Sequence, residues 1–134
     1  MTQNRYYHTA SVLTNGYVLV TGGRSLLVST DATKLYNPVT GLWTSTMSMM
    51  YVREQHAASL LSDGRVLVTG GTDSSFSSFN TAELFNPSTG TWTMTTNMTY
   101  ARYRHTASVL PSGQVLPVGG VDTYIATELY DSVT

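Results

Sequence analysis

The chain has 134 residues, of which 7 are basic and 8 are acidic, so its formal net charge is −1. Charged residues make up 11% of the sequence, against about 25% in a typical soluble protein. This composition excludes a polybasic nucleic-acid-binding protein, and no run of about 18 apolar residues predicts a membrane span. The absence of cysteine excludes disulfides, thiolate metal sites and a cysteine nucleophile. The first residues lack the apolar segment of a signal peptide, so an extracellular and a cytoplasmic location both stay open.

Three copies of one sequence pattern follow one another along the chain. Each copy has an arginine, a histidine three residues later, and a pair of glycines further on. These residues are Arg5, His8, Gly22 and Gly23, then Arg53, His56, Gly70 and Gly71, then Arg102, His105, Gly119 and Gly120. The first two copies also carry a tryptophan near their ends, Trp43 or Trp92. We therefore divide the chain into units at about residues 1–48, 49–97 and 98–134, of which the third stops before its tryptophan segment.

The first unit predicts four short strands separated by turns. The first strand runs from about residue 8 to residue 13 and precedes Asn15-Gly16, a dipeptide typical of tight hairpins. The second, at 17–21, is almost continuously apolar, which suits a strand that is covered on both faces. The third covers 33–36, and an Asn-Pro-x-Thr-Gly turn leads to the fourth at Trp43. In the third unit, Pro117 falls inside the second strand, where it either removes one ladder hydrogen bond or creates a bulge.

One four-stranded sheet of this size cannot bury both of its faces, and stacking such sheets around an axis solves the problem. The combination of Arg-x-x-His, Gly-Gly, Glu-Leu-Tyr and Gly-x-Trp resembles the kelch repeat. The resemblance implies an all-β fold made of kelch-type β-propeller blades, each a four-stranded antiparallel sheet. It implies three blades in this chain, of which the last lacks its outer strand.

Kelch propellers serve as adaptor modules, carbohydrate-associated domains and scaffolds of oxidases, so the resemblance alone leaves the function open. We expect no enzyme, because carboxylates are few and scattered and no Gly-x-Ser-x-Gly motif is present. The copper oxidases that carry kelch propellers use a tyrosine cross-linked to a cysteine, which this chain lacks. We expect no cofactor and no metal. The expected function is a non-catalytic module that binds a protein or a ligand such as a glycan. The alternative is a structural fragment of a larger kelch propeller, such as a secreted carbohydrate-associated or oxidase-like protein.

The loop after the second strand is the segment that differs most among the units. Apolar residues in otherwise polar loops are candidates for contact with a partner, although they could instead fold back over the blade edges. The candidate binding residues on this long-loop face are Arg24, Leu26, Leu27, Phe76, Phe79, Tyr124 and Ile125. Five tyrosines near the first strands would be stacking platforms if exposed and core residues if buried; they are Tyr6, Tyr7, Tyr51, Tyr100 and Tyr103.

The repeated polar residues allow a functional and a structural interpretation. The three histidines could form a ring that binds a metal or an anion, but their recurrence with the repeat favours structural hydrogen bonds. The three arginines could bind an acidic ligand, but we expect them to pair with Glu83, with Glu128 or with backbone carbonyls. Lys34 stands in the corresponding position of the first unit, which therefore lacks such a pair. The paired glycines are expected where no Cβ would fit.

Three blades would leave one apolar blade face open at each end of the array. We therefore expect the chain to associate with itself, most simply as a homodimer that closes a six-bladed propeller. A longer protein that supplies the remaining blades is the alternative. Neither nucleic acid nor a membrane is expected as a partner.

Overall fold

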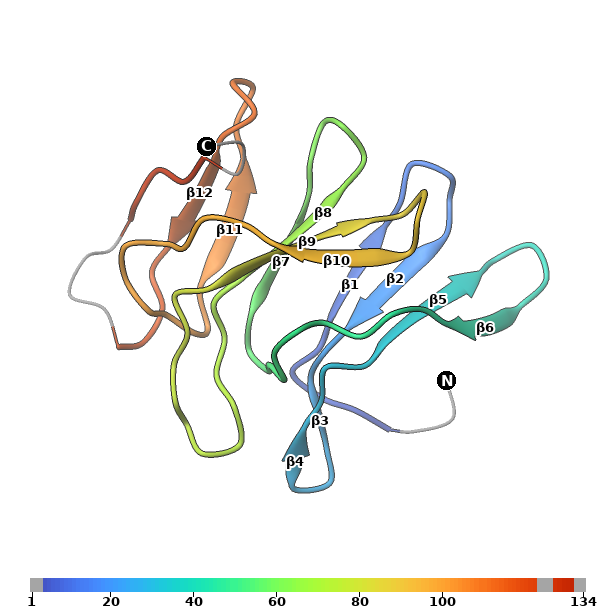
Figure 1. Ribbon diagram of the computed structural model, residues 1–134, viewed down its shortest axis with the longest axis horizontal. Coiled ribbons are helices and arrows are strands. Elements are labelled where there is room, and N and C mark those ends of the chain that lie inside the picture. Colours follow the sequence, from blue (N-terminus) through green and yellow to red (C-terminus); the bar gives the residue numbers. More distant parts are fainter. Residues whose placement is uncertain (1–3, 123–126, 132–134) are drawn as a thin grey trace.

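The computed structural model describes residues 4–122 and 127–131, and antiparallel sheets dominate this part of the chain (Figure 1). The first sheet has the strand order β1-β2-β5-β6, with β1 at Thr9–Val12, β2 at Val18–Thr21, β5 at Thr33–Asn37 and β6 at Leu42–Ser45. The second has the order β7-β8-β9-β10, with β7 at Ala57–Leu60, β8 at Val66–Thr69, β9 at Ala82–Asn86 and β10 at Thr91–Met94. The prediction of an all-β fold is confirmed for the described residues.

The third sheet is smaller than the other two. It pairs β11 (Thr106–Val109) with β12 (Val115–Val118), and single bridges join β12 to Thr127 and Tyr130. The segment 127–131 thus lies beside β12 as β5 lies beside β2. Pro117 pairs with Ala107 in regular register, so β12 accommodates the proline without a bulge.

The sheets stand side by side with their first strands together. Strand β7 contacts β1 on one side and β11 on the other. Figure 1 shows the hairpin turns after β1, β7 and β11 at one end of the molecule. The short hairpin of β3 (Arg24–Ser25) and β4 (Val28–Ser29) lies at the opposite end with the loop between β8 and β9. The loops that differ among the units therefore share one end of the molecule.

Two hydrophobic clusters fill the spaces between the sheets. Between the first and second sheets lie Leu13, Leu19, Met49, Val66, Val68, Phe85 and Trp92. Between the second and third sheets lie Leu61, Leu67, Ala82, Leu84, Met98, Val115 and Tyr130. Because side chains alternate along a strand, each sheet has two different faces. We call the face with valine and aromatic residues the front face and the leucine-rich face the back face. In both clusters, the back face of one sheet packs against the front face of the next.

In the ranges that the structure describes, no helix is long and apolar enough to span a bilayer.

Candidate binding surface

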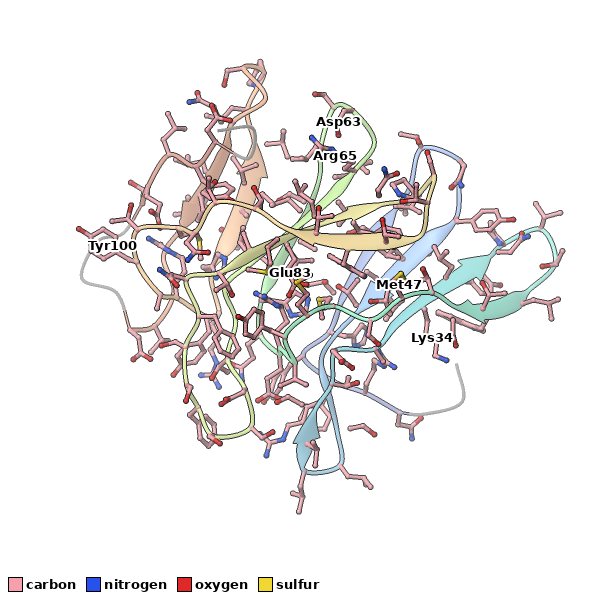
Figure 2. All side chains as sticks on the ribbon, in the orientation of Figure 1. Lys34, Met47, Asp63, Arg65, Glu83 and Tyr100 are labelled. Atoms are coloured by element: carbon pink, nitrogen blue, oxygen red, sulfur yellow. The ribbon has the colours of Figure 1, made fainter. Side chains whose placement is uncertain are left out.

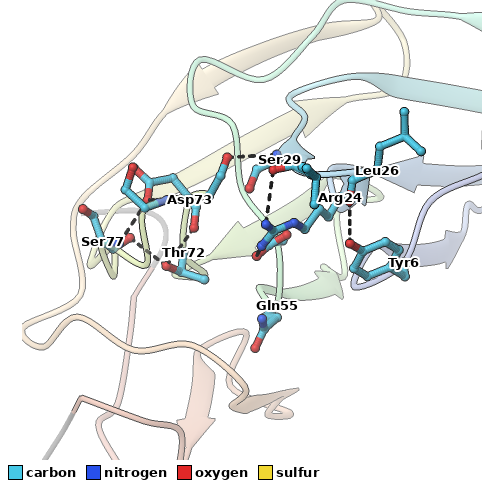
Figure 3. Close-up of polar contacts among 12 residues, drawn as sticks. Tyr6, Arg24, Leu26, Ser29, Gln55, Thr72, Asp73 and Ser77 are labelled. Atoms are coloured by element: carbon cyan, nitrogen blue, oxygen red, sulfur yellow. Dashed lines mark hydrogen bonds and ion pairs between the residues drawn. The ribbon is translucent and has the colours of Figure 1, made fainter.

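The β3–β4 hairpin carries two of the predicted binding residues at its tip. The side chains of Leu26 and Leu27 are 85% and 78% exposed. The hairpin is fixed at its base, where Arg24 forms a β-bridge with Tyr6 and the Tyr6 hydroxyl donates to the Leu26 carbonyl over 2.7 Å (Figure 3). These apolar side chains therefore extend from a loop that is held in place rather than folding back over the sheet.

The loop between β8 and β9 has the same character. The Asp73 carboxylate accepts the N–H groups of Ser75 and Ser77 over 2.8 and 3.0 Å, and the Thr72 hydroxyl donates to the Ser77 carbonyl over 3.0 Å. These bonds close a turn that presents Phe76 with 64% of its surface exposed. An aspartate that binds nearby backbone N–H groups is the usual way in which a short polar loop is made rigid.

Both tips have the left-handed backbone conformation. Leu26 has φ +55° and Phe76 has φ +63°, values that non-glycine residues rarely adopt and that are unusual for bulky side chains. The sequence pattern gave no sign of this feature, because neither loop has a glycine or asparagine at the strained position.

Hydrogen bonds join neighbouring loops into one surface. The Ser29 N–H donates to the Ser74 hydroxyl over 3.1 Å and links the two long loops. The Ser78 hydroxyl donates to Asp122 over 2.9 Å and continues the surface toward the third sheet. We use the name loop surface for the residues that these contacts bring together and that expose their side chains, which are Leu26, Leu27, Val28 and Phe76.

A buried ion pair lies below this surface. Arg24 donates through Nη1 to Oε1 of Glu54 over 3.2 Å, and the Glu54 side chain is fully buried. The pair joins the loop of the first unit to the start of the second. Arg24 was predicted to bind a partner, and the structure shows its charge compensated within the chain. Glu54 was not singled out from the sequence, although it stands where the other units have Tyr6 and Tyr103.

The remaining predicted loop residues lie elsewhere. Phe79 is half-buried, with its ring 5.9 Å from the ring of Tyr51 and 5.7 Å from the guanidinium carbon of Arg53, so it packs inside the unit rather than at the tip. Tyr124 and Ile125 lie outside the described residues. Among the tyrosines with two interpretations, Tyr103 is half-buried and the others are exposed; these are Tyr6, Tyr7, Tyr51 and Tyr100.

The repeated arginines are buried and hold their own units together. Arg53 donates to the carbonyls of Gly70 and Thr81 over 2.7 and 3.2 Å and forms a 2.7 Å ion pair with Glu83. Burial lowers the pKa of Arg53, and the charge of Glu83 opposes this shift. Arg102 repeats the arrangement with Gly119 at 2.8 Å and Glu128 at 3.1 Å. The predicted pairing of arginine with glutamate is therefore present in these two units.

The first unit lacks this ion pair. Arg5 donates to the carbonyls of Gly22 and Ala32 over 3.1 and 3.0 Å. Lys34, which has the register position of Glu83, instead donates to the Ser45 hydroxyl over 2.6 Å. Figure 2 shows Glu83 in the interior between the sheets and Lys34 toward the periphery.

Two histidines bridge neighbouring sheets through hydroxyl groups. Nε2 of His56 is hydrogen-bonded to Thr9 and Thr21 of the first unit at 2.8 and 3.3 Å. Nε2 of His105 is hydrogen-bonded to Thr69 of the second unit at 3.0 Å. Burial lowers the pKa of His56 to about 3 and that of His105 to about 4, with the nearby arginine charges adding to the shift. Both rings are therefore neutral at physiological pH.

In the first and second units, the first glycine of the Gly-Gly pair lies where the next unit leaves no space for a side chain. A Cβ on Gly22 would overlap with the Arg53 carbonyl oxygen, and a Cβ on Gly70 would overlap with the Arg102 carbonyl oxygen. Both have φ +59°, a conformation that glycine adopts without strain. Glycine is thus required at Gly22 and Gly70 by the packing between units as well as by the turn.

A recess in the described part of the chain lies away from the loop surface, and the described side chains form no cluster of metal ligands. Within the described ranges, no three His, Asp or Glu side chains are close enough to hold a metal ion. An open recess lies between the turns after β7 and β11, at the end of the strands opposite the loop surface. It is lined by Leu61, Ser62, Asp63, Ser112, Gly113, Gln114 and Asp131. No predicted binding residue lines this recess.

Comparison with known protein families identifies the second unit. Residues 55–99 match the model of the Kelch motif. The matched segment contains β7 to β10, so it spans the whole second sheet. No curated protein matches the chain. The chain therefore contains a kelch motif at residues 55–99 within an all-β structure, which is consistent with the kelch-repeat family.

Proposed function

We propose that the chain is a non-catalytic, β-propeller-like module that binds another protein through the loop surface. The partner is a protein segment with apolar side chains, because the exposed tips offer leucine, valine and phenylalanine. Surrounding polar groups, such as the Ser29 N–H and the Ser74 hydroxyl, are hydrogen-bonded to each other within the chain. A protein partner agrees with the use of many kelch propellers as adaptor modules.

The observation that supports the proposal is the strained backbone beneath exposed apolar side chains. A left-handed conformation costs roughly 1–2 kcal/mol for a residue with a Cβ, and asparagine or glycine tolerates it better. Leu26 and Phe76 are mostly exposed, so neither side chain offsets this cost by packing. Strain without a packing benefit is typical of residues that are kept for contact with a partner.

The rigidity of both loops supports the same conclusion. The Asp73 turn and the bond from Tyr6 to the Leu26 carbonyl hold the tips in one conformation before any partner arrives. A surface that is already ordered loses less conformational entropy on binding. The ion pair of Arg24 and Glu54 fixes the first loop against the second unit.

A library of random peptides displayed on phage provides a direct test. The immobilised chain is expected to enrich peptides that contain apolar residues. These peptides should bind the double variant Leu26→Asn, Phe76→Asn at least tenfold more weakly. Asparagine tolerates the left-handed conformation, so the double variant keeps the loop geometry while the apolar side chains are lost.

The variant Val39→Asn is the matched control, because Val39 is a 91% exposed apolar residue in the turn between β5 and β6. It should bind the selected peptides as the unchanged protein does. Enrichment no greater than on a blank surface would contradict the proposal, as would peptides that bind the double variant equally well.

A further inference from the structure

The two ends of the array expose complementary faces. The front face of the first sheet exposes Val12 and Trp43, whereas Trp92 at the equivalent place in the second sheet is buried. The back face of the third sheet exposes Leu129, whereas Leu84, its equivalent in the second sheet, is buried. Front and back faces are the two surfaces that meet in both hydrophobic clusters of the chain.

Backbone hydrogen bonds that recur between units show how a front and a back face align. The residue before each histidine donates its N–H to the same residue of the preceding unit, from Gln55 to Tyr7 over 3.0 Å and from Arg104 to Gln55 over 2.9 Å. The Tyr7 N–H would continue this series beyond the first unit as a donor. The Arg104 carbonyl would continue it beyond the third unit as an acceptor.

A second series runs in the opposite direction. Gly23 donates its N–H to the Arg53 carbonyl over 2.8 Å, and Gly71 donates to the Arg102 carbonyl over 2.9 Å. The corresponding groups at the ends are the Gly120 N–H in the third unit and the Arg5 carbonyl in the first. Each end therefore carries one donor and one acceptor that match those of the other end.

Gly119 marks the space that a following unit would occupy. Gly22 and Gly70 are crowded by the arginine carbonyl and the histidine ring of the next unit. No atom of residues 4–122 or 127–131 lies within 4 Å of the place where a Cβ on Gly119 would stand. The third unit thus has the shape needed to receive the start of another unit, and no described residue of the chain fills this space.

We propose that a second copy of the chain occupies this place, with the front face of its first sheet against the back face of the third sheet. Two such contacts join two chains into a closed pair with twofold symmetry. In each contact, Tyr7 donates to the Arg104 carbonyl of the other chain and Gly120 donates to the Arg5 carbonyl of the other chain.

The histidine bridge is also retained at this contact. His56 bonds to Thr9 and Thr21 together, and His105 bonds to Thr69 alone, so one threonine suffices. The third unit has Val118 opposite Thr106 in the register where the first unit pairs Thr9 with Thr21. His8 of the second copy therefore bonds to Thr106, in the place that Thr9 has in the first contact.

The proposal concerns end faces that are separate from the loop surface, so it can fail while peptide binding remains. The first measurement is the molar mass of the full chain by light scattering after size exclusion, from 1 to 100 µM. We expect a mass of twice 14.6 kDa at the upper concentrations. A monomer throughout this range would overturn the proposal, and so would a mass that grows beyond two chains.

A matched pair of glycine variants tests the location of the contact. Gly119 and Gly41 have φ +71° and +70°, and at neither glycine does an atom of the described residues lie within 4 Å of the Cβ position. Alanine strains the backbone equally at both positions, but only at Gly119 would its Cβ meet the second copy. Gly119→Ala should raise the dissociation constant of the pair at least tenfold, and Gly41→Ala should leave it unchanged. An equal effect of the two variants would overturn the assigned contact.

Mixing two charged variants tests the head-to-tail arrangement. Trp43→Asp and Leu129→Asp should each be monomeric alone, because each change damages both contacts of the pair. An equimolar mixture should form a heterodimer through one contact. In that contact the unchanged back face of the Trp43→Asp variant meets the unchanged front face of the Leu129→Asp variant. Association of either variant with itself, or failure of the mixture to associate, would show that the faces do not pair in this way.

Discussion

Trp92 and Trp43 occupy the same position in consecutive units, yet their surroundings differ. Trp92 is 5% exposed, packs against Phe85, and donates its indole N–H to the Met47 carbonyl over 3.1 Å. Trp43 packs against Tyr36 in the same way but is 37% exposed. The difference arises from position in the array, because the second sheet has a neighbour on each face and the first has only one. The same position of the repeat therefore lies at the surface in the first unit and in the core in the second.

The largest expected effect is the loss of Trp92. Trp92→Ala should lower the free energy of unfolding by about 4 kcal/mol, because it removes a large side chain from a packed cluster. Trp43→Ala should lower it by about 1 kcal/mol or less in the monomer. Urea denaturation at a protein concentration where the chain is monomeric checks both values. Equal costs would show that the first and second sheets are not stabilised differently.

The ion pairs sharpen the comparison between the same two units. Glu83→Gln should lower the free energy of unfolding by about 3 kcal/mol, because it leaves the buried charge of Arg53 without its counter-charge. Lys34→Glu places a carboxylate beside Arg5 and should raise the free energy of unfolding by up to about 1 kcal/mol. Urea denaturation of both variants beside the unchanged protein measures these effects. A Lys34→Glu variant that is clearly less stable would show that Arg5 is not equivalent to Arg53.

Acid should weaken the contacts between sheets through the buried histidines. Folding lowers the pKa of His56 to about 3, whereas in the unfolded chain it is about 6.5. Between these values the unfolded chain binds a proton that the folded chain does not, so the free energy of unfolding falls as the pH falls. From pH 7.5 to 5.5 the loss should be about 1 kcal/mol for this residue. Urea midpoints across this range should depend less on pH in His56→Gln, and an unchanged dependence would contradict the assignment.

The smallest expected effect lies on the loop surface, which supports neither hydrophobic cluster. Leu26→Asn should change the free energy of unfolding by no more than a few tenths of a kcal/mol, with a gain favoured because asparagine tolerates φ +55°. Thermal unfolding beside Leu19→Ala, which empties part of the buried cluster, gives the scale. A loss as large as that of Leu19→Ala would place Leu26 in the core.

Much of the fold could be predicted from the sequence because the unit is repeated. Three aligned copies of histidine, paired glycines and an apolar strand identify the strands better than one copy would. The partnership of Arg53 with Glu83 followed from their joint recurrence, and the exception at Lys34 was visible in the same comparison. The hydrophobic pattern also indicated that β2 would be covered on both faces.

The loop surface was harder to predict because its residues occur once. The sequence indicated that Leu26 and Phe76 were unusual in polar loops, but the conformation of their backbone depends on bonds from Tyr6 and Asp73. The half-buried position of Phe79 depends on its contact with Arg53, which only the folded unit brings near. Repetition therefore predicts what the units share, and the three-dimensional structure is needed for what distinguishes them.

The repeated contact also bears on how such a chain can change in length. The first and second sheets each pack their back face against the following sheet, and both contacts use the same glycine and histidine residues of the repeat. The second unit is therefore a structural repeat of a one-dimensional array, in which each unit contacts only its neighbours. A chain in which residues 49–97 occur twice would need no new type of interface, since the extra copy would meet a back face before it and a front face after it. An insertion of only two strands would instead supply half of each face and leave part of the neighbouring sheets uncovered. Growth or loss in this array is therefore compatible with folding only in whole units, and each whole step leaves both end faces unchanged.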